Sequence, residues 1–321
     1  MTVTTKQTMH EQTGAPRRGR TKARRSRIAP YLLSGPAMLL YLSFTVIPVG
    51  YSFVSSFFAM RLTGTGVLGG TRNSVFVGFE NYLSVVQDNE LLAGLGRLAI
   101  YGLIAVPMTL GLALVFALLL DTPGVRFKRF GRVALFIPYA VPGVVGALLW
   151  GFMYLPETSP FSYVTENLGL GAIPFLEAEG LYGALANIAI WGGVGFNMLV
   201  IFTTLRAIPG ELVEAARLDG ASELQIAMQI KLPLVVPALI LTGIFGLIGA
   251  LQLYGEPITL KPLTNAISDT WAPLMTIYRD AFMLDSLPQA AASANVLAIG
   301  TAALSLAVLA IVRYINRRAN R

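Results

Sequence analysis

The side chains that most often carry covalent or metal chemistry are scarce in this sequence. The chain has no cysteine and a single histidine, His10, which lies in a polar N-terminal stretch. Disulfide frameworks, iron–sulfur clusters and thiolate metal sites are therefore excluded, and catalysis or zinc binding by histidine is disfavoured. Glu211 and Glu214 lie one helical turn apart and could be paired catalytic acids, but the helix dipole also explains two glutamates near a helix start. We expect no catalytic residue and no metal site.

Aromatic and amide side chains in the long uncharged stretches could bind a polar solute reversibly. Transporters place such side chains inside a helix bundle near the membrane midplane, and sugars favour aromatic stacking together with hydrogen bonds. For each candidate, a helix-packing contact or a position in the interfacial aromatic belt is the alternative. The candidates for a solute pathway are Tyr139, Trp191, Phe196, Asn197, Gln252 and Tyr254.

The distribution of charge defines the elements that must position these residues. Only 13% of the 321 residues are charged and 55% are hydrophobic, whereas a soluble domain carries about 25% charged residues. A membrane-spanning helix needs about 20 mostly apolar residues, and buried helices of a soluble protein would show polar faces. Six stretches longer than 20 residues lack Asp, Glu, Lys and Arg: 28–60, 98–120, 133–156, 180–205, 232–255 and 286–312. They predict an all-α membrane protein with six transmembrane helices, at roughly 30–54, 95–120, 133–155, 181–205, 233–255 and 289–312.

The orientation follows from the basic residues, which concentrate on the cytoplasmic side of membrane proteins. Of the 24 Lys and Arg residues, 19 fall on the side that holds both termini and five on the other, which predicts cytoplasmic termini. Residues 1–27 are polar and basic, and the apolar run that follows is too long for a cleaved signal peptide. We expect a disordered tail at 1–27 that is attracted to anionic lipid rather than to nucleic acid. A single transmembrane domain follows at 28–313, and a basic C-terminus at 314–321.

The predicted orientation places the loop at 206–232 in the cytoplasm. This loop is amphipathic and contains the start and stop signals of two helices. Pro209 suits the first turn of a helix, and Gly220 suits a left-handed C-terminal cap. Ser222 with Gln225 three residues later matches a capping box, which starts a second helix. The pattern predicts a helix–turn–helix on the cytoplasmic surface. It is either an interfacial connector or a docking surface for a partner.

This loop resembles the signature loop of ABC importer permeases. The shared elements are Glu214-Ala215-Ala216, then Asp219-Gly220-Ala221, then Ile230 and Leu232-Pro233. The resemblance covers about 30–313 and is to the sugar-importer group of the maltose and glycerol-3-phosphate permease type. It is also carried by Gly78–Tyr82, by Leu135–Pro142, and by Ile277-Tyr278 with Ala290–Ala292. The sequence departs from the group at Tyr254–Pro257, where many members have Gly-Gly-Pro.

The resemblance implies a type I ABC importer permease fold in which the loop couples to a cytoplasmic ATPase. By that analogy Glu214 pairs with a basic group of the ATPase. Asp219 and Gly220 shape the turn, and Ala215, Ala216 and Ala221 allow close packing. The implied partners are a second, related permease chain, an ATPase dimer and an external solute-binding protein. ATP would be bound by the partner, since this sequence has no phosphate-binding loop of the Gly-x-x-x-x-Gly-Lys type. Among the pathway candidates, the resemblance favours Tyr139, Phe196 and Gln252.

The resemblance implies a sugar-importer permease located in a bacterial or archaeal cytoplasmic membrane. Two other classes of function are alternatives. An ion-coupled secondary transporter usually carries ionisable residues inside its spans, and the six stretches hold none. An intramembrane enzyme needs a catalytic His, paired carboxylates or a metal cluster. The importer of a sugar or oligosaccharide is the favoured interpretation, and a polyol or glycerol-phosphate solute stays open.

Overall fold

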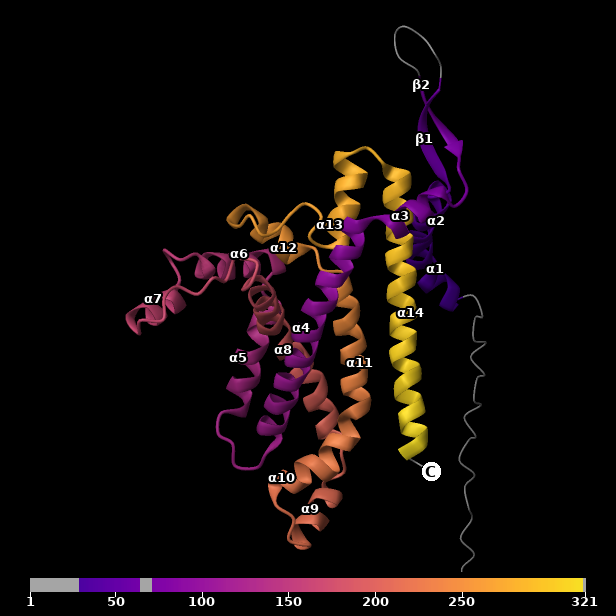
Figure 1. Cartoon of the computed structure of the whole chain (residues 1–321). Helices are drawn as coiled ribbons and strands as arrows, with labels where there is room; N and C mark the ends of the chain where they lie inside the picture. The colour runs from indigo at the N-terminus through magenta and orange to yellow at the C-terminus, as the bar shows by residue number, and fades with distance from the viewer. Residues whose placement is uncertain (1–28, 64–70, 320–321) are drawn as a thin grey trace, which may run out of the picture. The chain divides into compact units, whose positions relative to one another are not determined.

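The computed structural model describes residues 29–63 and 71–319 (Figure 1). It divides at Gly50 into two parts, which we describe separately. The first part holds α1 (Ala29–Tyr41) and a π-helical turn (Leu42–Val46), and the division falls within the next helix, α2 (Ile47–Ser55). The tail predicted at 1–27 lies outside the described residues.

The second part is built around four helices, α4 (Asn89–Asp121), α5 (Lys128–Ala140), α8 (Leu181–Arg206) and α11 (Leu232–Leu251). α4 starts six residues before the predicted span because the side chain of Asp88 accepts hydrogen bonds from the amides of Glu90 and Leu91. Two apolar clusters fill the interior. One surrounds Leu185 and Trp271, and the other surrounds Met198 and Ile201.

The third predicted span is not one straight helix. α5 ends at Ala140, α6 (Gly143–Tyr154) begins three residues later, and the two axes differ by 96°. Pro142 explains the break, because a proline disfavours the α conformation in the residue before it. Val141 is accordingly extended, with φ −76° and ψ 128°. The helix predicted at roughly 133–155 is therefore present as two helices with a sharp bend between them.

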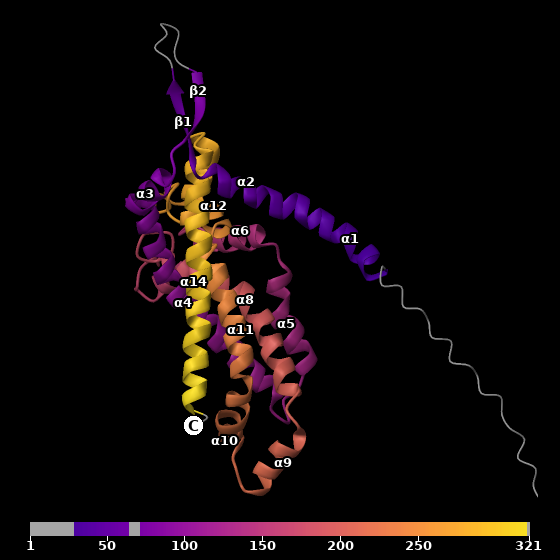
Figure 2. The ribbon, with the colours of Figure 1, turned by 90° about the vertical axis from the view of Figure 1, so that its right-hand side faces the viewer.

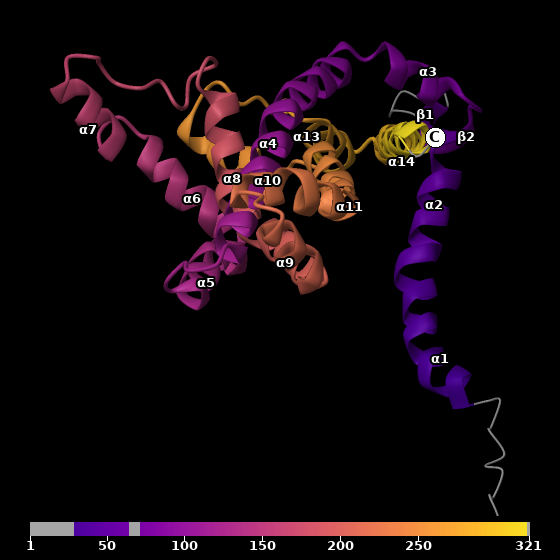
Figure 3. The ribbon, with the colours of Figure 1, turned by 90° about the horizontal axis from the view of Figure 1, so that it is seen from below.

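Shorter helices cover the end of the bundle opposite α9 (Gly210–Leu218) and α10 (Glu223–Gln225), as Figures 1 and 2 show. They are α3 (Glu80–Gln87), α12 (Gly255–Leu260) with a 3-10 turn (Lys261–Leu263), and α13 (Pro273–Tyr278) with a π-helical turn (Arg279–Met283). α7 (Pro160–Asn167) projects to the side of the bundle instead (Figure 1). The last helix, α14 (Leu287–Ala319), lies beside α11 and α13 (Figure 3). Its first turns pack closely because Ala290, Ala291 and Ala292 are all buried.

A β-hairpin follows α2, outside the six predicted transmembrane helices. β1 (Phe58–Thr63) pairs antiparallel with β2 (Thr71–Phe76), with Phe58 opposite Phe76. Their rings meet edge to face at 5.5 Å, a cross-strand contact that stabilises a hairpin. The side-chain amide of Asn81 holds the base of the hairpin by donating hydrogen bonds to the carbonyls of Ser56 and Phe58. The fold is therefore mostly helical rather than strictly all-α.

Within residues 29–63 and 71–319, five helices are long and apolar enough to cross a membrane, and the bent pair α5–α6 would make six. The predicted multi-pass helical architecture is confirmed at this level, while the count of six spans and the side of the termini stay predictions.

Candidate functional site

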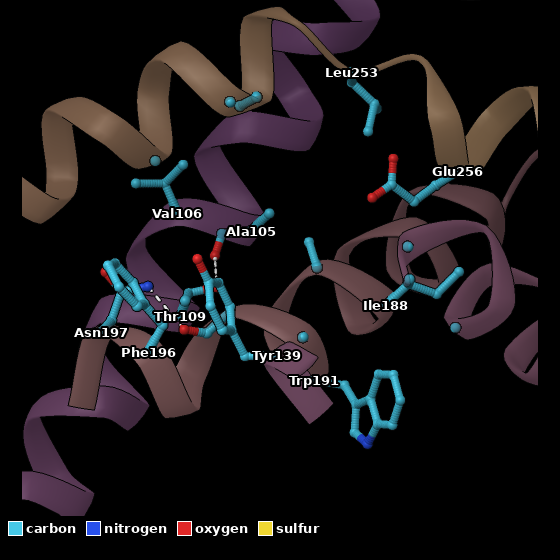
Figure 4. A pocket seen from close by; sticks show the side chains of 18 of the residues that line it. Ala105, Val106, Thr109, Tyr139, Ile188, Trp191, Phe196, Asn197, Leu253 and Glu256 are labelled. Atoms are coloured by element: carbon cyan, nitrogen blue, oxygen red, sulfur yellow. Dashed lines mark hydrogen bonds between the residues drawn. The ribbon is translucent and has the colours of Figure 1, made fainter. Parts of the chain in front are cut away.

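A cavity of about 650 Å³ lies among α4, α5, α8 and α11, beside the break between α5 and α6 (Figure 4). The break matters here because residues on both sides of it, from Pro138 to Gly146, contribute to the cavity wall. All six predicted pathway residues line this one cavity: Tyr139, Trp191, Phe196, Asn197, Gln252 and Tyr254. Their part in solute passage stays a prediction.

Two aromatic rings form a stacked pair on one wall. Tyr139 of α5 and Phe196 of α8 lie with ring centroids 4.8 Å apart and planes inclined by 19°. Both rings are more than a third exposed. The two helices approach closely at Gly195, where an added Cβ would overlap the carbonyl oxygen of Leu135. Glycine at 195 is therefore what lets the two rings meet.

Polar side chains beside the rings are oriented by the backbone. Asn197 Nδ2 donates to the carbonyl of Gly193 at 2.8 Å, and Thr109 Oγ1 donates to the carbonyl of Ala105 at 2.7 Å. On another wall, the Trp191 ring packs against Gly146, where a Cβ would come within 3.1 Å of a ring carbon. The cavity thus combines ring faces with hydroxyl and amide groups.

The segment after α11 contributes the wall nearest α12. Gln252 caps the C-terminus of α11, and the Tyr254 ring lies 5.8 Å from that of Tyr278. Glu256, in the first turn of α12, is the one charged side chain among the described residues that line the cavity. Figure 4 shows its carboxylate pointing toward the same space as the Tyr139 ring. Sequence reasoning missed Glu256, although its signal was present in the departure at Tyr254–Pro257.

The coupling loop at 206–232 has the predicted helix–turn–helix form. α9 ends at Leu218, Gly220 has a left-handed φ of 85°, and Ser222 forms a complete capping box with Gln225. An ion pair of 2.8 Å joins Arg217 Nε to Glu223 Oε1 across the turn. This hydrogen bond to Glu223 is the main cause of the raised pKa of the Arg217 guanidinium.

The second helix of the coupling loop continues into the next span. α10 runs through a π-helical turn (Ile226–Lys231) directly into α11. The second helix of the loop and α11 therefore form one continuous helical segment, Glu223–Leu251.

The coupling loop has an anchored face and a free face. Ile226 is fully buried against the bundle, whereas Leu218 is 89% and Leu224 73% exposed. Of the residues that the resemblance assigns to coupling, Glu214, Ala215, Asp219 and Gly220 are exposed, and Ala216 and Ala221 are half-buried.

A buried ion pair anchors the coupling loop to the bundle. Lys231 Nζ, in the π-helical turn, lies 2.6 Å from Asp121 Oδ2 at the end of α4, and the two side chains are 8% and 10% exposed. Arg206, at the end of α8, approaches the other oxygen of Asp121 at 3.9 Å but is largely exposed. Removing one partner of such a buried pair costs about 3–5 kcal/mol. This pair could not be predicted from the sequence, because its members are 110 residues apart.

The comparisons with known proteins agree with the resemblance seen in the coupling loop. A family model described as a binding-protein-dependent transport system inner membrane component matches residues 113–321. The diacetylchitobiose uptake system permease protein of Streptomyces coelicolor is 28% identical over 319 residues, which cover 94% of this chain and 87% of that protein. The sn-glycerol-3-phosphate transport system permease protein of Agrobacterium fabrum is 32% identical over 212 residues, 66% of this chain and 70% of that protein.

Solved structures show the same fold. One chain in the crystal structure of a bacterial ABC transporter involved in importing the acidic polysaccharide alginate superimposes with a TM-score of 0.72 at 19% identity. The match covers 92% of this chain and 98% of that chain. Because the family model covers well over half of the sequence, the chain belongs to the family of binding-protein-dependent transport system inner membrane components.

Proposed function

We propose that this chain is one of two related permease subunits of an ATP-driven importer of a neutral sugar or oligosaccharide. The importer lies in the cytoplasmic membrane of a bacterium or archaeon, with both termini of this chain in the cytoplasm. An external solute-binding protein delivers the sugar. A separate ATPase dimer binds and hydrolyses ATP, and this chain holds no cofactor.

The observation that carries the solute class is the composition of the cavity. Its volume of about 650 Å³ falls in the range of roughly 300–1,000 Å³ that small-molecule sites occupy. The stacked rings of Tyr139 and Phe196 offer an aromatic face of the kind on which the C–H faces of a sugar ring pack. Asn197, Gln252 and Tyr254 supply groups that exchange hydrogen bonds with sugar hydroxyls.

The charge of the cavity favours a neutral solute. Glu256 is its one charged residue within the described lining, with no Lys, Arg or His to balance a phosphate or carboxylate. Charges of like sign repel each other more strongly in a cavity than in water. Among the similar proteins, this supports a solute like diacetylchitobiose, whose amines are acetylated and uncharged, over the anions glycerol 3-phosphate and alginate.

The free face of the coupling loop supports docking on the ATPase. Glu214 is exposed on α9 and available to a basic group of the partner. The capping box and Gly220 hold the turn in shape before docking. Ala215 is exposed and Ala216 and Ala221 are half-buried, so a partner can approach the helix closely there.

The test is uptake of labelled diacetylchitobiose into proteoliposomes that hold the chain with its partner permease, ATPase and binding protein. We expect uptake to require ATP on the ATPase side. Phe196→Ala removes the ring that stacks on Tyr139 and should lower uptake roughly tenfold, since one aromatic contact is worth about 1 kcal/mol or more beyond its buried area. Phe152→Ala is the matched control, because Phe152 is an exposed ring outside the cavity lining. Equal uptake by both variants would remove the stacked pair from the pathway.

A second candidate is an ion-coupled secondary transporter, and Glu256 is the observation that favours it. A lone carboxylate in a transport cavity can serve as a proton or cation site. In that case uptake would follow an imposed ion gradient, collapse with a protonophore and proceed without ATP. An importer of the proposed type gives the opposite result in all three conditions.

A further inference from the structure

The buried ion pair between Asp121 and Lys231 connects three parts of the molecule. Asp121 is the last residue of α4, and Lys231 ends the π-helical turn that joins the coupling loop to α11. Their 2.6 Å contact fixes the inner end of α4 to the entry of α11. The exposed Arg206 reaches Asp121 from the end of α8.

Stability alone does not account for charges at this position. Three apolar residues near the pair along the chain, Leu120, Ile226 and Val235, are all buried. In such surroundings a well-packed apolar pair is often as stable as an ion pair, or more so. What an ion pair adds is a contact of fixed geometry, since it depends on distance and direction where an apolar contact can slide.

The two helices that this pair joins are both walls of the solute cavity. α4 contributes Tyr101, Ala105 and Thr109 to the lining, and α11 contributes Thr242 and Phe245. Thr109 lies twelve residues before Asp121, which is roughly 18 Å along a helix. A displacement at the coupling loop therefore reaches both walls through a rigid contact at their shared end.

Resting on the function proposed above, we infer that Asp121 and Lys231 are positioning residues that make α4 and α11 move as one body with the coupling loop. The pair transmits the motion of the ATPase to the cavity walls. Without it, the ATPase can still dock and hydrolyse ATP, but the walls no longer follow the loop.

Charge-removal and charge-exchange variants in the reconstituted complex test this inference. Asp121→Asn and Lys231→Met each remove one charge, and the double exchange Asp121→Lys with Lys231→Asp restores a pair in the opposite sense. Arg61→Met is the matched control, because the Arg61–Glu80 pair also joins distant elements at 2.7 Å but is exposed. The readouts are co-purification of the ATPase, ATP hydrolysis, and diacetylchitobiose molecules imported per ATP hydrolysed.

We expect each single variant to lower the molecules imported per ATP by roughly tenfold or more while hydrolysis persists, because breaking a buried pair leaves one charge without its partner. The double exchange should recover transport to within about threefold of the original chain, and Arg61→Met should stay within the same limit because exposed pairs contribute little. Normal transport by a single variant, or an assembled double exchange that stays inactive, overturns the inference. Absence of ATP-dependent uptake by the unchanged complex would instead count against the proposed function.

An apolar replacement separates coupling from folding if the single variants do not assemble. Asp121→Leu with Lys231→Met fills the same space without charge, and it should assemble but import poorly. Transport at the original rate by this variant would mean that packing suffices and would overturn the inference.

A distance measurement gives a readout that loss of stability alone does not produce. The chain has no cysteine, so Leu119→Cys on α4 and Glu211→Cys on α9 can carry spin labels in a complex whose other subunits lack cysteine. Both positions are exposed. With the pair intact, the distance between the labels should stay narrow and equal with and without ATP. With Lys231→Met it should broaden when ATP is added, and an unchanged distribution contradicts the inference.

Discussion

Glu256 sets the electrostatic character of the cavity, since it is the one charged side chain among the described lining residues. Its neighbours along the chain, Gln252 and Tyr254, are polar and uncharged, and both line the same space. A carboxylate there should concentrate cations and repel anions whatever the transported solute is. The charge can therefore be measured without knowing the natural substrate.

A cysteine placed in the cavity lining reports the local electrostatic potential. Gln252→Cys adds the only thiol in the chain, at an exposed position that lines the cavity. We expect a cationic methanethiosulfonate reagent to react faster than an anionic one of similar size. Adding Glu256→Gln should lower the ratio of the two rates by roughly threefold to tenfold, because a charge several ångströms away in a partly screened site contributes about 1 kcal/mol.

A thiol far from the cavity serves as the control for intrinsic reagent reactivity. Tyr163→Cys on α7 is exposed and outside the cavity lining, so Glu256→Gln should leave its ratio unchanged. If the ratio at position 252 also stays the same, Glu256 does not govern the cavity charge and the preference for neutral solutes loses its support.

Among the elements, the contact between α5 and α8 decides the shape of the cavity wall. The helices approach so closely at Gly195 that a Cβ would overlap the carbonyl oxygen of Leu135. Backbone carbonyls cannot move aside as a flexible side chain can, so the helices would have to separate. The same contact brings the Tyr139 and Phe196 rings together.

Gly195→Ala should therefore destabilise the chain and impair transport, while Gly183→Ala should do neither. Gly183 lies in the same helix and has no atom within 4 Å of an added Cβ. Overpacking costs about 1–3 kcal/mol, which for a chain of this size lowers the melting temperature by roughly 2–10 °C. The measurement is the temperature at which half of the detergent-solubilised protein remains monodisperse. A Gly195→Ala protein as stable as Gly183→Ala would contradict the close crossing.

The elements also show which parts of the structure the sequence could predict. The spans were predictable because charge is excluded from hydrocarbon, so uncharged stretches mark them directly. The absence of charge does not show whether the helix bends within a stretch. The 133–156 stretch is uncharged throughout, yet Pro142 turns the helix by 96° inside it. The hairpin was missed because two six-residue strands leave too short a pattern to separate from a loop.

The candidate site was predictable to the extent that residue type alone defines a role. Amide side chains are few in the uncharged stretches whereas aromatic ones are common there, and the six residues chosen all line one cavity. Contacts between distant residues are different. Asp121 and Lys231 each look like ordinary charges next to a span, and only the fold brings them within 2.6 Å.

For the whole molecule, we expect the two ends of the helix bundle to have different functions. The cavity lies among the helices, the coupling loop lies at one end, and α12 lies at the other (Figures 1 and 2). α7 projects to the side, nearer to α12 than to the coupling loop (Figure 1). If 19 of 24 basic residues mark the cytoplasmic side, α9 faces the ATPase and α7 faces outward. Two positions, one on each helix, are enough to test this arrangement.

Ala215→Cys on α9 and Tyr163→Cys on α7 are the two probes, each the single thiol of the chain. Position 215 is the better choice on α9 because Ala215 is exposed and Ala216 is half-buried. A membrane-impermeant maleimide added to intact cells should label the thiol at 163 and should reach the thiol at 215 only after permeabilisation. In membranes of the intact complex, a short bifunctional reagent should join the thiol at 215, and not the thiol at 163, to the ATPase.

Labelling of 215 from outside would invert the predicted topology, since it would place α9 and both termini outside the cell. Correct topology without any crosslink to the ATPase would retain the membrane arrangement but remove the coupling role from the loop, leaving the ion-coupled transporter as the better explanation.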